Sequence, residues 1–108
     1  MHNLNLTIAV LDAVGAERER QTKLFSDGLI PFDCADPSIC SFFKLPVLIE
    51  EVGEVAQEMN DPEHDAIDLY TELVQVAAVA VAMAEAVMLR HSPDGVAAET
   101  RNSQPFTE

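Results

Sequence analysis

Residues 72–87 read ELVQVAAVAVAMAEAV and are the most apolar part of the chain. Alanine, valine and methionine fill almost every position, so a helix here has no polar face and must be covered on all sides. The apolar run 73–89 is short for a membrane span, and Gln75 and Glu85 interrupt it with groups that hydrocarbon penalises. We therefore expect a buried helix in an all-α protein, covered partly by a second subunit.

Two more helices are expected before this one. Apolar residues at helical spacing predict a helix over about 4–25. Pro46 suits a first helical turn and predicts a second helix over 46–60. Asp61 can cap the free amides of the next helix, which should run over about 61–90. The sequence thus predicts three helices, no strand, and a shared core of the four-helix-bundle type when two chains pair.

The chain has 108 residues, which suits one domain with a thin core. We place that domain at residues 1–91 and expect a weakly ordered tail over 92–108. Gly28, Pro31 and Pro37 break the chain between the first two helices. That loop either covers a pocket or is a plain connector packed by its own apolar residues, which are Ile30, Phe32 and Ile39.

The charge balance excludes several classes of partner. Lys plus Arg total 6 against 19 Asp plus Glu, which gives a net charge of −13. Such a chain repels nucleic-acid phosphates and acidic membrane surfaces. Disorder throughout is also excluded, because 48% of the residues are hydrophobic and they are patterned. The first residues lack a basic leader, so we expect a cytoplasmic protein.

Two cysteines, Cys34 and Cys40, lie close together in the predicted loop. The interpretation we favour is two reduced thiols, because a disulfide framework in so short a chain normally needs more cysteines. A local disulfide remains open, as does half of a zinc site completed by His64 or His91.

Carboxylates gather on the second and third predicted helices at steps of three and four residues. If these helices pack antiparallel through a short turn, their acidic stripes converge, and a divalent cation would offset the repulsion. The alternative is that these acids are the solvated faces of two amphipathic helices. The acidic and amide positions concerned are Glu50, Glu51, Glu54, Glu58, Asp65, Asp68, Glu72 and Gln75.

Residues 44–60, KLPVLIEEVGEVAQEMN, together with residues 72–87, resemble the MazG-like nucleotide pyrophosphohydrolases of the all-α NTP pyrophosphatase superfamily. The motif of that superfamily is Glu-x-x-Glu, a spacer, then Glu-x-x-Asp. Its first half matches Glu51 to Glu54, and its second half falls at Glu72 to Gln75. The stretch AERERQTK, residues 16–23, is similar to the first helix of small members of the superfamily.

The resemblance implies hydrolysis of a nucleoside triphosphate, NTP or dNTP, to the monophosphate and pyrophosphate. It implies Mg²⁺, or Mn²⁺ in its place, and a homodimer or homotetramer. Glu50 and Glu51 would then be catalytic, with Glu50 orienting the water, and Lys23 and Lys44 are candidates to bind the phosphates. The implied metal ligands are Glu51, Glu54, Glu72 and Gln75.

The sequence departs from the motif at Gln75, where the family has an aspartate. A glutamine carbonyl can coordinate Mg²⁺ but brings no charge and cannot act as a base. The alternative function is therefore a catalytically degenerate relative, a helical dimer that binds a nucleotide or a protein partner.

Overall fold

A computed structural model describes residues 3–91 of the chain, and this part is all-helical. Its elements are α1 (Leu4–Ser26), α2 (Ser41–Asn60) and α3 (Ala66–Arg90). The all-α prediction with three helices and no strand is confirmed for these residues. The tail predicted over 92–108 lies outside the described residues.

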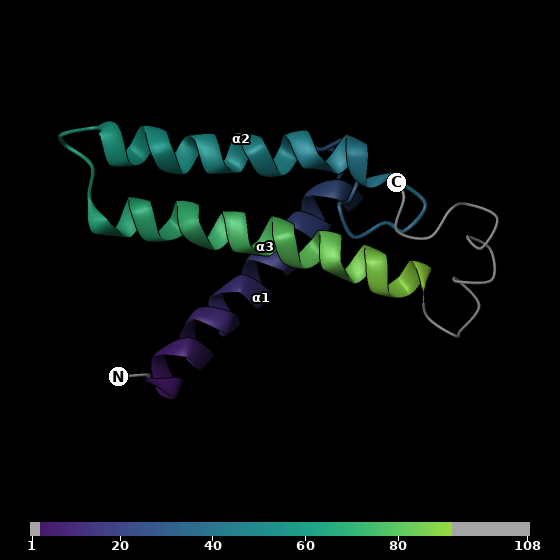
Figure 1. The fold of residues 1–108 in the computed structure, drawn as a ribbon, viewed down its shortest axis with the longest axis horizontal. Helices are drawn as coiled ribbons and strands as arrows, with labels where there is room; N and C mark the ends of the chain where they lie inside the picture. Colours follow the sequence, from purple (N-terminus) through teal and green to yellow (C-terminus); the bar gives the residue numbers. More distant parts are fainter. Residues whose placement is uncertain (1–2, 92–108) are drawn as a thin grey trace.

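The helices α2 and α3 lie side by side as an antiparallel hairpin (Figure 1). The third helix, α1, crosses this hairpin near the end where α2 begins, and it packs against α3 (Figure 1). Its N-terminal half extends away from the hairpin, so the predicted apolar positions Leu4, Ile8 and Leu11 are exposed while Val14 is buried.

The start of α2 differs from the prediction. The helix begins at Ser41 rather than at Pro46, which lies inside it. Pro46 has no N–H to donate to the carbonyl of Phe42, so the early part of the helix lacks one hydrogen bond. The N-cap residue, Cys40, makes no side-chain cap hydrogen bond. No capping signal in the sequence therefore marks this start.

The start of α3 also differs, because the expected cap, Asp61, is used in a turn. Its Oδ1 accepts from the backbone N–H of Glu63 at 2.8 Å, and its carbonyl accepts from the N–H of His64 at 3.1 Å. The helix begins after Asp65, whose side chain accepts from the N–H of Asp68 at 2.8 Å. Such an N-cap satisfies one of the free amides of the first turn.

The core lies along one face of α3 and consists of small side chains. Val74 and Ala78 cluster with Val14 of α1, and Ala78 is fully buried. Small residues let the helices approach closely, but they leave little apolar volume for a single chain to bury. The thin core expected from the length is thus present, and much apolar surface remains uncovered.

Apolar side chains at helical spacing remain exposed on both helices of the hairpin, with 37–75% of their surface accessible. The α3 stripe consists of Tyr70, Leu73, Val81 and Met88, and the α2 stripe consists of Leu45, Ile49, Val52 and Met59. Within residues 3–91, α3 is also the one helix long and apolar enough to cross a membrane. Core helices of soluble proteins share that composition, so length and hydropathy assign no location to the chain.

Two buried cations hold the loop that joins α1 to α2. Lys44 is fully buried, and its Nζ donates to the carbonyl of Asp36 at 2.7 Å. Arg90 donates through Nε and Nη2 to the carbonyl of Pro37 at 3.1 and 2.6 Å, and through Nη2 to that of Ile39 at 3.1 Å. The loop is therefore fixed against the start of α2 and the end of α3.

Arg90→Met is expected to lower the free energy of unfolding by about 2 kcal/mol, because two part-buried carbonyls lose their charged donor. Urea denaturation followed by circular dichroism measures this change. Lys23→Met is the matched control, since Lys23 has 77% of its side chain exposed. Equal midpoints for the Arg90 variant and the wild type would contradict the role of Arg90 in holding the loop.

Candidate metal centre

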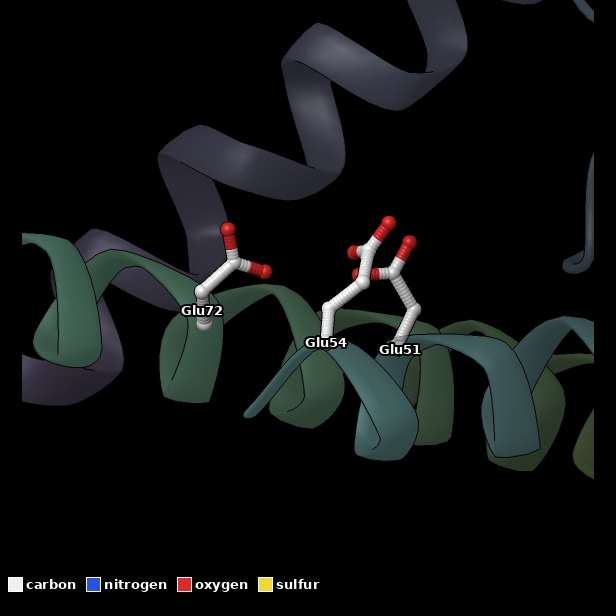
Figure 2. Close-up of side chains that lie close together, drawn as sticks. All are labelled: Glu51, Glu54 and Glu72. Carbon is white, nitrogen blue, oxygen red and sulfur yellow. The ribbon is translucent and has the colours of Figure 1, made fainter. Parts of the chain in front are cut away.

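Three glutamates from two helices meet at one point of the hairpin. Glu51 and Glu54 lie one turn apart on α2, and Glu72 lies on α3. One carboxylate oxygen from each residue lies within 4.8 Å of the other two. Figure 2 shows the three side chains rising from the α2–α3 hairpin to the same side. Within residues 3–91 this is the one group of Asp, Glu, His or Cys side chains spaced to hold a metal ion.

The carboxylates of this group are not satisfied by the protein. The Oε2 atoms of Glu51 and Glu72 are buried, and neither has a hydrogen-bond partner among the described residues. Burying an ionised carboxylate without a partner is costly, and three together repel one another. The structure thus brings together three partly buried carboxyl groups whose negative charge a bound cation would neutralise.

The pKa values of Glu51 and Glu72 reflect the same burial and the same repulsion between carboxylates. Burial, then the neighbouring charges of Glu54 and Glu72, raise the pKa of Glu51 from its ordinary 4.5 to about 7. Burial is also the main cause that raises the pKa of Glu72, and the charge of Glu54 is the next. Desolvation and like charges both disfavour the ionised form of a carboxyl group.

Hard divalent cations fit this set of donors. Mg²⁺ prefers oxygen ligands in octahedral geometry and is commonly held by a few carboxylates plus substrate phosphates. Glu51, Glu54 and Glu72 would supply some of these oxygen ligands, and other oxygen donors such as water would complete the set. The arrangement is suited to Mg²⁺ or Mn²⁺ and lacks the nitrogen and sulfur donors typical of zinc.

The other predicted metal and catalytic positions lie around this group. Glu50 is exposed on α2, and its charge contributes to the raised pKa of Glu51. Gln75 is half-buried on α3, three residues beyond Glu72. Cys34 and Cys40, the other candidate ligands, are free cysteines in the loop.

The two lysines predicted to bind phosphate are engaged elsewhere. The Nζ of Lys23 lies 3.0 Å from the Oδ2 of Asp27 at the end of α1. Lys44 donates from its buried position to the loop carbonyl of Asp36. Neither contact is to the three glutamates.

The loop between α1 and α2 lines a cavity of about 200 Å³ beside the three glutamates, which agrees with one of the two alternatives expected for this loop. Glu51 also lines this cavity. The sequence did not lead us to expect that α1 contributes Glu17, Arg20 and Gln21 to the wall of this cavity. A signal for this was present, because Glu17, Gln21 and Leu24 recur at the spacing of one helix face. That face points at the loop rather than at solvent.

The comparisons add no relative to this picture. Comparison of the chain with protein-family models, curated proteins and solved structures finds no match.

Proposed function

We propose that the protein is a Mg²⁺-dependent nucleoside triphosphate pyrophosphohydrolase, which converts an NTP or dNTP to the monophosphate and pyrophosphate. The observation that carries this proposal is the meeting of Glu51, Glu54 and Glu72 with two buried carboxylate oxygens that lack partners. These are the positions at which the sequence resembles the MazG-like motif. The geometry supports the proposal because the motif residues converge across two helices.

In this proposal the three glutamates hold the cation and orient the triphosphate. When bound, Mg²⁺ supplies charge neutralisation of the phosphates and lowers the pKa of a coordinated water. A chain with a net charge of −13 needs such a cation to bind a polyanion. Glu50, exposed beside Glu51, is the proposed acceptor of the proton from the attacking water. The water oxygen then bonds to the α-phosphorus, and pyrophosphate leaves with the bridging oxygen.

The test is release of pyrophosphate and nucleoside monophosphate from a panel of NTPs and dNTPs. Each reaction is run with Mg²⁺, with Mn²⁺ and with EDTA, and the products are separated by ion-exchange chromatography. Metal-dependent formation of both products in equal amounts supports the proposal. Nucleotide binding without turnover would instead favour a degenerate relative, in which the uncharged Gln75 has weakened the metal site.

We also propose that two chains pair through the α2 and α3 stripes. The stripes recur at helical spacing, and such a seam is typical of helices that pack in bundles. Two hairpins that pair through them would form a four-helix core and cover the apolar surface that one chain leaves exposed. A tetramer would add a second contact, for which the exposed apolar half of α1 is available.

Sedimentation equilibrium is expected to give at least twice the 11.8 kDa chain mass. Leu73→Glu/Val81→Glu places two carboxylates in the α3 stripe and is expected to give a monomer, because pairing would bury unpaired charge. Thr22→Glu, which adds a carboxylate to an exposed polar position on α1, should leave the mass unchanged. A folded wild-type monomer at micromolar concentration would contradict the pairing.

A further inference from the structure

The cavity beside the three glutamates lies between α1, the loop and α2. Its volume is about 200 Å³, and Glu51 belongs both to its wall and to the glutamate group. The cavity is therefore within reach of a ligand whose phosphates bind at the glutamates. The apolar residues of the wall are Leu24, Ile30, Pro31, Phe32, Val47 and Val79.

One polar group on the wall, the amide of Gln21, has a defined orientation. Nη1 of Arg18 donates to Oε1 of Gln21 at 3.0 Å, and Nε2 of Gln21 donates to Oε2 of Glu17 at 3.3 Å. Guanidinium groups only donate and carboxylates only accept, so the oxygen and nitrogen of this amide cannot exchange places. The amide can still make two more hydrogen bonds, because one lone pair on its oxygen and one hydrogen on its nitrogen are not used by these contacts.

The partners that orient this amide are themselves held. Arg20 donates through Nε and Nη2 to the two oxygens of Glu17, both at 2.7 Å. Arg18 donates through Nε and Nη2 to Oε1 of Glu85 on α3 at 3.3 and 3.1 Å. The amide is thus pre-oriented by charged groups on both sides, and little entropy is lost when a ligand binds to it.

We propose that this cavity binds the base of a pyrimidine nucleotide and that Gln21 is the residue that recognises it. The inference rests on the proposed function, which places the phosphates at Glu51. A volume of about 200 Å³ is below the roughly 300–1,000 Å³ of pockets for drug-sized ligands, so it suits a single ring better than a fused purine.

The chemistry of the wall agrees with a pyrimidine. Its apolar side chains suit the faces of a flat, uncharged ring, and Phe32 is among them. The edges of cytosine and uracil each present a donor beside an acceptor, as the edges of purines also do, and a primary amide offers the complementary pair. Gln21 therefore strengthens the binding of a base through its edge. The preference for a pyrimidine comes from the volume of the cavity, and the amide by itself does not separate cytosine from uracil.

Nucleosides test this inference without metal, phosphate or turnover. The full chain, labelled with ¹⁵N, is titrated with cytidine, uridine, adenosine and guanosine in EDTA, and the side-chain amide signals are followed by NMR. The two pyrimidines are expected to shift the Gln21 signals saturably and to bind at least about tenfold more tightly than the purines, because the cavity volume suits a single ring.

Two variants test whether the amide of Gln21 contributes to binding of the base. Gln21→Leu is expected to weaken pyrimidine binding by about tenfold. Gln21→Glu keeps an oxygen acceptor for Arg18 but removes the amide hydrogens, and it should also weaken pyrimidine binding, which keeps the test decisive if the leucine variant is unstable. Gln57→Leu, an exposed amide on α2 outside this cavity, is the matched control and should bind as the wild type does.

The outcomes separate this inference from the proposed function. Equal affinity for purines and pyrimidines, absence of nucleoside binding, or unchanged binding by both Gln21 variants would overturn the inference, while metal-dependent release of pyrophosphate would still support the function. Pyrimidine binding that depends on Gln21, in a protein that releases no pyrophosphate, would support the cavity assignment and overturn the function.

Discussion

Glu54→Gln is expected to reduce metal-dependent release of pyrophosphate by about 100- to 1,000-fold, since bound metal supplies several kcal/mol of charge stabilisation. Glu54 lies between Glu51 and Glu72 (Figure 2), and its charge raises the pKa of both. The glutamine variant keeps the shape of the side chain and removes one charge. Initial rates at saturating substrate, measured across a range of Mg²⁺ concentrations, give the size of the effect.

The matched control for this loss is Glu19→Gln. Glu19 is exposed on α1 and lies outside the group of three. The same change of charge there should leave the rate within a few-fold of the wild type. Calorimetric titration with Mg²⁺ distinguishes loss of the metal from loss of chemistry. A Glu54→Gln variant that binds Mg²⁺ and turns over normally would remove the three glutamates from the proposed site.

The metal-free protein is expected to be less stable at pH 8 than at pH 5.5, because Glu51 ionises in that interval. Its pKa is about 7 in the folded protein and 4.5 ordinarily, so between these values the folded state binds more protons than the unfolded chain. Stability then falls as the pH rises, and above pH 7 the full cost of the buried charge is present. Thermal unfolding in EDTA at the two pH values measures the difference.

Glu51→Gln removes that cost and is expected to raise Tm at pH 8 by on the order of 5 °C. Mg²⁺ should raise Tm of the wild type at pH 8, because it binds the folded state, and should do so much less in the variant. Glu19→Gln, an exposed carboxylate on α1, is the control for the change in net charge. An unchanged Tm in Glu51→Gln, with an undiminished response to Mg²⁺, would contradict the electrostatic role of Glu51.

Much of the helical architecture could be predicted because it depends on local patterns. The bounds of α1 follow from apolar periodicity, the end of α3 follows from the helix-breaking sequence Ser-Pro-Asp-Gly at 92–95, and both predictions agree with the structure. The start of α3 was wrong because Asp61 and Asp65 are both good caps, and hydrogen bonds within the turn decide between them. No local signal marks the early start of α2, because the side chain of its N-cap residue, Cys40, makes no cap hydrogen bond.

The candidate site also has a part that the sequence predicts and a part that it does not predict. The pairing of Glu51 with Glu54 follows from the helix repeat, and Glu72 joins them because a short turn makes the hairpin antiparallel. The cavity and the orientation of Gln21 depend on where the loop rests. That position is set by contacts between residues far apart in the sequence, such as Arg90 with Pro37. The apolar periodicity of the sequence contains no information about these long-range contacts.

The attachment of the loop has a consequence for which substitutions the sequence can accept during evolution. Lys44 and Arg90 donate hydrogen bonds to the main-chain oxygens of residues 36, 37 and 39. Every amino acid supplies such an oxygen. Substitutions within the loop therefore leave its anchors in place. Residues such as Ile30 and Phe32, which face the cavity, are free to vary without loosening the segment that carries them. The fold thus provides a stretch of chain in which ligand preference can diversify while the helices and their glutamates stay constant.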